Sequence, residues 1–122
     1  MKVTSDYILV CMLFMHIVDD YYLQGILASM KQKEWWKKNA PNPKYKNDYI
    51  LALLMHGFSW SFMIQLPIMV FCNKYSLAFL IYNAIVHANI DDEKANKSTL
   101  NLIEDQIIHI VQILVTWCLV VL

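Results

Sequence analysis

The sequence predicts an all-α protein, an integral membrane four-helix bundle that forms one domain over residues 1–122. Two observations lead to this prediction. Hydrophobic residues make up 58% of the chain, more than the roughly 45–50% of an average soluble domain, and a chain this short cannot bury so much apolar surface in a core of its own. The hydrophobic residues are also gathered into four long segments, which span residues 7–27, 49–71, 75–90 and 100–122.

The second segment is the clearest membrane span. Residues 49–71 carry no formal charge and exceed the ~20 residues that a helix needs to cross a bilayer, and Pro67 near the end of the segment could kink that helix. The third segment is short. Its helix therefore either tilts little or extends through Asp91 and Asp92 toward the lipid headgroups.

The lysines predict how the bundle is oriented. All ten basic residues are lysines, and eight of them lie between the first and second or between the third and fourth segments, against Lys2 and Lys74 on the opposite side. Since positive charge favours cytoplasmic loops, both lysine-rich connections are expected in the cytoplasm, with both termini outside the bacterial inner membrane. The first connection also contains Trp35 and Trp36 among its lysines, which predicts a basic interfacial loop or short helix.

The overall charge argues against one class of partner. The formal net charge is zero, and the chain lacks the basic stripe that a nucleic-acid partner would need. Membrane lipids are the expected partners, and assembly into a homo-oligomer stays open. The three cysteines lie far apart in apolar segments and form no C-x-x-C pair, so they predict packing roles.

Polar residues interrupt each apolar segment at helical spacing. Every segment contains one histidine, and in three of them an aspartate lies four residues away, so that both side chains share one helix face. In helices of alternating direction, these side chains fall in one layer near the cytoplasmic leaflet. The candidate site consists of His16 and Asp20, His56, His87 and Asp91, and Asp105 and His109.

This combination of histidines and aspartates predicts a metal centre. A carboxylate deep in a membrane helix costs about 2.5–3.5 kcal/mol on insertion scales, so the aspartates need compensation. For any single His–Asp pair a local hydrogen bond is the simpler interpretation, but repetition on three helices favours a metal. Four imidazoles and three or more carboxylates suffice for one or two divalent cations, with zinc favoured over manganese or iron. Each aspartate either binds the metal or accepts the other N–H of its histidine.

Three stretches resemble the signatures of a known family. "HIVDDYYLQ", "HANIDDEK" and "DQIIH" are similar to the H-x-x-x-D-F-x-L-Q, H-x-x-x-D-x-x-K and D-Q-x-x-H motifs of a family of small bacterial and phage integral membrane proteins, known only as a domain of unknown function. The motifs occur in family order over most of the chain. Tyr21 replaces the usual phenylalanine, and Asp19 is not part of the pattern. The resemblance implies the membrane fold and a site that contains His16, Asp20, Gln24, His56, His87, Asp91, Lys94, Asp105, Gln106 and His109.

These residues predict a metal-dependent intramembrane hydrolase that acts on lipid or lipid-linked phosphate near the cytoplasmic leaflet. The cation would activate a water molecule, and Asp20, Asp91 and Asp105 would be shared between metal ligation and the role of catalytic base. Lys94 and Lys97 would contact the phosphate. Two alternatives stay open: a channel or transporter for protons or divalent ions, and a non-catalytic membrane interaction module. The mainly apolar outer halves of the segments favour a pocket over a pore.

Overall fold

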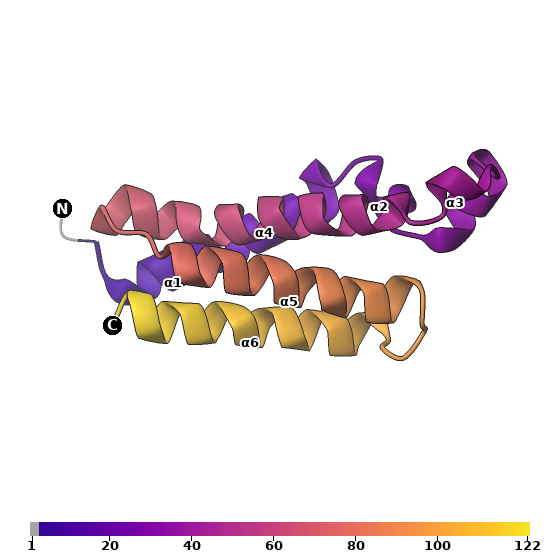
Figure 1. Ribbon diagram of the computed structural model, residues 1–122. Helices are drawn as coiled ribbons and strands as arrows, with labels where there is room; N and C mark the ends of the chain where they lie inside the picture. The colour runs from indigo at the N-terminus through magenta and orange to yellow at the C-terminus, as the bar shows by residue number, and fades with distance from the viewer. Residues whose placement is uncertain (1–2) are drawn as a thin grey trace.

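Four long helices form the protein (Figure 1). The computed structural model describes residues 3–122, which are mostly helical and contain no strand. The long helices are α1 (Ser5–Ile17), α4 (Asp48–Cys72), α5 (Leu77–Ala95) and α6 (Leu102–Val120). The all-α prediction is therefore confirmed. The third segment takes the longer of its two predicted forms, because α5 continues through Asp91 and Asp92.

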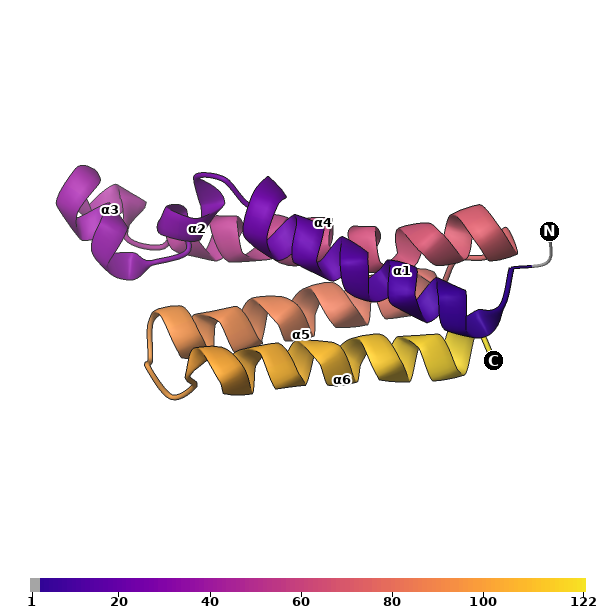
Figure 2. The same ribbon diagram turned by 180° about the vertical axis from the view of Figure 1, so that it is seen from behind.

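The four long helices close into a bundle. α4 and α5 lie side by side, α6 packs against α5, and α1 completes the ring by packing against both α4 and α6. Figures 1 and 2 show both termini at one end of the bundle, together with the connection between α4 and α5. The connections from α1 to α4 and from α5 to α6 lie at the opposite end. The two lysine-rich connections therefore share one end of the molecule.

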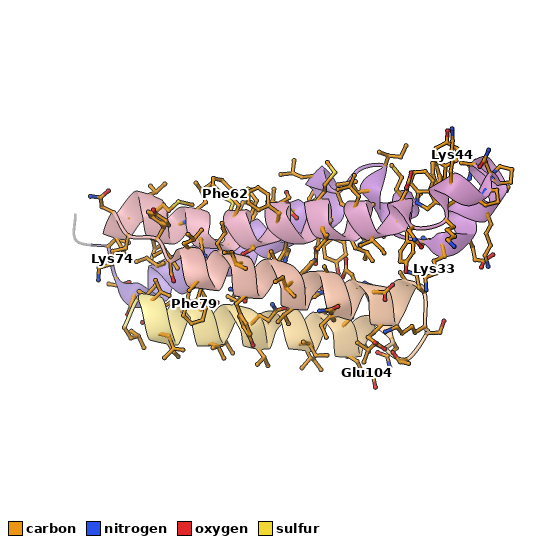
Figure 3. The ribbon with its side chains drawn as sticks, in the orientation of Figure 1. Lys33, Lys44, Phe62, Lys74, Phe79 and Glu104 are labelled. Atoms are coloured by element: carbon orange, nitrogen blue, oxygen red, sulfur yellow. The ribbon has the colours of Figure 1, made fainter. Side chains whose placement is uncertain are left out.

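The chain between α1 and α4 forms a hook of four short elements: the π-helix η1 (Val18–Leu23), α2 (Leu27–Met30), α3 (Lys33–Asn39) and the 3₁₀-helix η2 (Pro43–Tyr45). Gly25, with φ at 55°, lets the chain leave η1 in a left-handed conformation. The predicted short helix among the lysines is present as α3. Figure 3 shows Lys33 and Lys44 on the hook and Lys74 at the other end of the bundle, whereas Lys2 lies outside the described residues.

The side chain of Asn96 ties the hook to the end of α5. Its Oδ1 accepts from the Lys33 backbone N–H (2.8 Å), and its Nδ2 donates to the Lys31 carbonyl (2.9 Å). Trp36 Nε1 adds a bond to the Met30 carbonyl at 2.7 Å. The backbone beside Lys31 is therefore held against α5, which fixes where the Lys31 side chain enters the bundle.

A glycine allows α4 and α5 to approach closely. A Cβ atom at Gly57 would collide with the Ala84 carbonyl oxygen, so no larger residue fits without moving one helix. Small residues at a helix–helix contact let two backbones come together in this way. Because His56 precedes Gly57 and His87 lies one turn beyond Ala84, this contact also sets the separation of two histidines.

Many buried residues are polar, and many exposed residues are large and hydrophobic. Among residues 3–122, thirteen buried residues are polar or charged and nine are hydrophobic, whereas thirty large hydrophobic residues are exposed. Phe62 is an example on α4, where it points away from the bundle (Figure 3). A polar interior inside an apolar outer surface is the arrangement that a membrane environment favours.

Two helical stretches, Pro43–Cys72 and Leu102–Val120, are long and apolar enough to cross a membrane by length and composition. The first runs unbroken past Pro67. α1 has only 13 residues, and α5 ends in a charged turn. The helix bundle is thus present, but only two of its described helices are long and apolar enough to cross a membrane. That all four helices span a membrane stays a prediction.

Candidate metal centre

The four histidines meet between the long helices. Each comes from a different helix, and none is more than 4% exposed. The rings of His87 and His109 stack with centroids 4.0 Å apart, His56 lies 4.9 Å from His87, and His16 lies 6.0 Å from His109. The structure therefore brings into one layer the histidines that the sequence spaces on four separate helices.

The π-helix η1 turns two consecutive aspartates toward His56. Asp20 Oδ1 lies 3.1 Å from His56 Nε2, and Asp19 Oδ2 lies 3.5 Å from His56 Nδ1. Ser59 Oγ donates to Asp19 Oδ1 at 2.6 Å. Consecutive residues of a regular α-helix point about 100° apart. The wider π turn, a feature common at functional sites, lets both carboxylates face one ring.

Asp91 lies in the middle of the cluster, with its two oxygens facing different histidines. Oδ2 is 3.6 Å from the Nε2 atoms of both His56 and His87, and Oδ1 is 3.4 Å from His109 Nε2. The ammonium group of Lys31 reaches the same carboxylate from the hook, 2.5 Å from Oδ2. Since Lys31 is only 6% exposed, its positive charge is buried against Asp91.

Asp105 is held so that one oxygen faces His109. Its Oδ2 accepts from Lys94 Nζ (2.7 Å) and Gln106 Nε2 (3.0 Å). Its Oδ1 lies 3.3 Å from His109 Nε2 and receives no hydrogen bond. The carboxylate therefore presents one free oxygen to the histidine cluster.

A chain of amide groups and a hydroxyl fixes the tautomer of His109. Gln112 Nε2 donates to two oxygens of Asn83 (3.2 and 3.3 Å), and Asn83 Nδ2 donates to Thr116 Oγ1 at 2.8 Å. Gln112 Oε1 is thereby turned toward His109 Nδ1, 3.0 Å away, so this nitrogen carries the proton. The lone pair of a neutral His109 is then on Nε2, where it faces carboxylate oxygens instead of a donor.

Several buried polar atoms of this cluster have no hydrogen-bond partner. They are both ring nitrogens of His87, His109 Nε2, Asp105 Oδ1, Asp19 Oδ2 and Gln24 Oε1. An unpaired buried group costs about 1–3 kcal/mol, so native structures rarely keep one without a water or an ion. Two triplets of ligand atoms, each within 4.8 Å of one another, come from Asp20, His56 and His87 and from His87, Asp91 and His109. These groups could hold a metal ion.

His16 lies beside the cluster but is engaged on both sides. Trp60 Nε1 donates to His16 Nδ1 at 2.8 Å, and His16 Nε2 lies 3.0 Å from Gln106 Oε1. Because an indole N–H can only donate, the proton of His16 is on Nε2 and is donated to Gln106. Of the seven predicted metal ligands, His16 and Asp105 fall outside the two triplets, although Asp105 keeps its free oxygen beside His109.

Sequence reasoning missed two central residues, Lys31 and Trp60. Lys31 was grouped with the other lysines of the first connection, because Gly25 interrupts the helical spacing that would relate it to the polar stripe of α1. Trp60 stacks on His87 with ring centroids 4.3 Å apart. It lies four residues after His56, and that spacing could have placed it on the inner face of α4.

A cavity of about 230 Å³ adjoins the cluster at the hook end of the bundle. Its lining consists of Asp20, Tyr21, Gln24, Lys31, Asp91, Lys94, Leu102 and Gln106. Tyr21 and Leu102 are more than half exposed and mark its mouth. Lys97, predicted to meet a phosphate together with Lys94, pairs with Glu93 at 2.5 Å and does not line this cavity.

Comparison of the chain with protein-family models, with curated proteins and with solved structures gave no match. The motif resemblance to small bacterial and phage membrane proteins therefore stays a prediction. The candidate metal centre rests on the distances, burial and unpaired atoms of the chain itself.

Proposed function

We propose that this protein is a metal-dependent membrane hydrolase whose four long helices span a bacterial inner membrane, with the hook at the cytoplasmic face. The outward-facing hydrophobic residues, thirty of them large, support the membrane location. Lipid solvates such a surface, whereas water would select against a continuous apolar exterior. The concentration of lysines at the hook end supports the orientation.

One observation is the main support for a bound metal. Imidazole nitrogens of His87 and His109 and one oxygen of Asp105 have no hydrogen-bond partner, and all three side chains are fully buried. A divalent cation held by His87, Asp91 and His109 would use these atoms, with the free Asp105 oxygen beside it. Imidazole and carboxylate ligands suit zinc, and manganese or iron accepts the same donors.

The charges of the cluster also favour a divalent cation. Four carboxylates are opposed by two ammonium groups, so that two negative charges remain when the imidazoles are neutral. Uncompensated negative charge is costly inside a membrane protein, and a bound divalent cation would offset it. The charged side chains are Asp19, Asp20, Asp91 and Asp105 with Lys31 and Lys94.

The side chains around the cavity supply what hydrolysis of a phosphate ester needs. A divalent cation at this place would lower the pKa of a bound water molecule and polarise a phosphoryl oxygen. Asp20 lines the cavity and can accept the proton of the attacking water. Lys31 and Lys94 line the same cavity and can donate to phosphate oxygens.

The position of the cavity supports a lipid substrate. Its mouth lies between Tyr21 of η1 and Leu102 at the start of α6, both exposed, at the end of the bundle that carries the hook. A phosphate headgroup could enter there while its acyl or prenyl chains stay in the bilayer against the apolar outer surface. The substrate class that fits is therefore a lipid phosphate of the cytoplasmic leaflet.

A channel for protons or ions is less well supported. Ile8, Met12, Ile64, Ile68 and Ile113 are each at most 3% exposed and pack together in the other half of the bundle. An ion path would need polar groups through that half, and an apolar core fills it instead. A non-catalytic interaction module would share the bundle and the metal but would turn over no substrate.

Metal content tests the centre. Protein purified in detergent should contain at least one divalent ion per chain by elemental analysis, and His109→Ala should lower that content. Gln65→Ala, a buried polar residue of the other half, is the matched control and should leave it unchanged. A folded metal-free protein, with a melting temperature insensitive to added zinc, manganese and iron, would contradict the proposal.

Turnover is measured separately. Metal-loaded protein in lipid nanodiscs should release phosphate from monoester or diphosphate lipids, and Asp20→Asn should abolish the release. If the protein holds its metal but cleaves none of these lipids, the interaction module becomes the better account.

A further inference from the structure

One oxygen of Asp91 completes a set of four possible metal ligands. This set, called set A, consists of Asp91 Oδ2, Asp20 Oδ1, His56 Nε2 and His87 Nε2. Each imidazole nitrogen lies 3.6 Å from Asp91 Oδ2, and Asp20 Oδ1 lies 3.1 Å from His56 Nε2 and 3.6 Å from His87 Nε2. Set A lies on the side of Asp91 that faces the cavity, since Asp20 and Asp91 both line it.

The other oxygen of Asp91 belongs to a second set. Set B consists of Asp91 Oδ1, His109 Nε2 and Asp105 Oδ1, and the histidine nitrogen lies 3.4 Å from the first oxygen and 3.3 Å from the second. Neither His109 Nε2 nor Asp105 Oδ1 has a hydrogen-bond partner. The carboxylate of Asp91 thus stands between two groups of ligands, with one oxygen in each.

The distances between each histidine nitrogen and the carboxylate oxygens of its set match those of a tetrahedral cation site. Zinc lies about 2.0–2.2 Å from nitrogen and oxygen ligands, which places neighbouring ligand atoms of a tetrahedron about 3.3–3.6 Å apart. The distances measured in set A run from 3.1 to 3.6 Å, and those in set B are 3.3 and 3.4 Å. Asp20, His56 and His87 of set A already form one of the triplets within 4.8 Å, whereas Asp91 is not grouped with them and set B is not such a triplet. The histidine nitrogens are therefore in place, and the carboxylates of each set would draw closer together on cation binding.

In each set, one imidazole has an acceptor atom near its far nitrogen. Gln112 Oε1 lies 3.0 Å from Nδ1 of His109, which keeps the proton there and leaves the Nε2 lone pair for a metal, the usual arrangement of metal-binding histidines. Asp19 Oδ2 lies 3.5 Å from Nδ1 of His56 without a hydrogen bond, and it would take the His56 proton when a cation replaces the bond from Nε2 to Asp20. Two such histidines, aimed at two different oxygens of one aspartate, point to two cations.

We propose that the centre binds two divalent cations, one in set A and one in set B, bridged by the carboxylate of Asp91. This inference rests on the proposed metal-dependent hydrolase and refines it, because His87 then serves set A alone instead of sharing one cation with His109. Set A supplies four ligands, among them Asp20 Oδ1, and set B supplies three, so only Oδ2 of Asp20 stays available to accept a proton. A pair of cations can stabilise both the attacking and the leaving oxygen of a phosphate ester, so phosphate esters are the substrate class that this centre takes.

Lys31 competes with the cation of set A. Its ammonium group lies 2.5 Å from Asp91 Oδ2, so it neutralises the oxygen that set A needs. A cation in set A would repel this ammonium group toward the cavity that Lys31 also lines. There the ammonium group could donate a hydrogen bond to a phosphate oxygen. In set B, Lys94 pairs with Asp105 through Oδ2, which set B does not use, and no lysine contacts the Asp91 oxygen of that set, so we expect set B to bind its cation more tightly than set A.

Cation stoichiometry tests the inference on the unmodified chain. Metal-stripped protein in detergent is titrated with Mn²⁺, bound metal is counted by elemental analysis, and electron paramagnetic resonance reports magnetic coupling. We expect two ions per chain, unequal in affinity, and a spin-coupled spectrum at saturation. One ion per chain with an uncoupled spectrum would overturn the pair but leave the metal-dependent hydrolase intact, and no bound ion would overturn both.

Single substitutions assign the ions to the sets. His56→Gln should remove the weaker ion and keep the tighter one, whereas Asp105→Asn should remove the tighter ion and keep the weaker one. Either variant should abolish the spin-coupled spectrum while retaining one ion. If both variants lose the same ion, the ligands belong to a single site and the inference is wrong.

Replacing Lys31 gives a readout in the opposite direction. Lys31→Met removes the competing charge, so the weaker ion should bind about tenfold more tightly or better, and tenfold corresponds to only about 1.4 kcal/mol. Lys37→Met, on the exposed face of α3, is the control and should leave both affinities unchanged. Unchanged or weaker binding in Lys31→Met would contradict the competition.

Discussion

The two ends of the bundle treat buried polar groups differently. In the half that holds the termini, Ser61 Oγ donates to the Leu80 carbonyl, and the Gln65 amide both donates to and accepts from the Ser76 backbone. In the half that holds the hook, the His/Asp cluster keeps several buried polar atoms unpaired. Within residues 3–122, the buried side-chain atoms without partners all belong to this half. Buried polar atoms without partners are rare in native structures. Their concentration at one end of a bundle whose other end pairs its polar groups supports a binding site at that end.

Trp60 forms the boundary between these halves. Its ring stacks on His87 and its Nε1 donates to His16, while the same side chain belongs to the apolar core with Ile64 and Ile68. One residue therefore closes the floor of the metal centre and caps the apolar core. Substitutions on either side of this boundary test whether the two halves are independent.

The largest expected effect lies in the apolar half. Ile64→Ala removes a fully buried side chain and should lower the free energy of unfolding by about 2–5 kcal/mol through lost contacts and a cavity. Thermal unfolding in detergent measures this loss, and elemental analysis should show unchanged metal content. Loss of the metal along with stability would mean that the two halves are not independent.

A substitution at the α4–α5 contact should affect both halves. Gly57→Ala forces the helices apart at the Ala84 carbonyl, which should cost about 1–3 kcal/mol of stability and weaken metal binding, because His56 moves relative to His87. Phe58→Ala, the adjacent exposed position, serves as the control. Metal affinity equal to that of the unmodified protein would show that the contact does not position the histidines.

Replacing one buried glutamine in each half tests the difference between the two halves directly. Gln112→Leu removes the acceptor behind His109 and should reduce metal affinity about 10–100-fold, the usual effect of losing such a partner. Gln65→Leu removes hydrogen bonds to Ser76 and should reduce stability only. Metal titrations measure the affinity of each variant. Equal affinities would mean that Gln112 does not fix the tautomer of His109.

The smallest expected effect is at the boundary. Trp60→Phe keeps a ring over His87 but removes the donor to His16, which should cost about 1 kcal/mol and release the tautomer of His16. Nitrogen-15 chemical shifts of the imidazole report that release. Trp117→Phe, which removes a bond to the Ser5 carbonyl, should leave the His16 signals unchanged; shifts of equal size in both variants would point to a general loosening.

Sequence spacing was sufficient for the parts of the site that lie on one helix. His87 and Asp91, like Asp105 and His109, are four residues apart, and all four residues are buried as this spacing predicts. Spacing did not predict where the backbone departs from an α-helix. Asp19, three residues after His16, lies 3.5 Å from His56 in the π-helical η1, and no local pattern in the sequence indicated that turn.

Hydrophobic periodicity and charge placement are properties of consecutive residues, so they were enough to predict the four helices, the inner face of each and the end of the bundle at which the lysines gather. Three features became visible only in the folded bundle: Lys31 enters the cluster from the hook, Trp60 stacks against it, and the two oxygens of Asp91 face different histidines. These features depend on how far apart the helices pack and how each is rotated. That geometry is set by contacts between residues distant in sequence, such as Gly57 with Ala84.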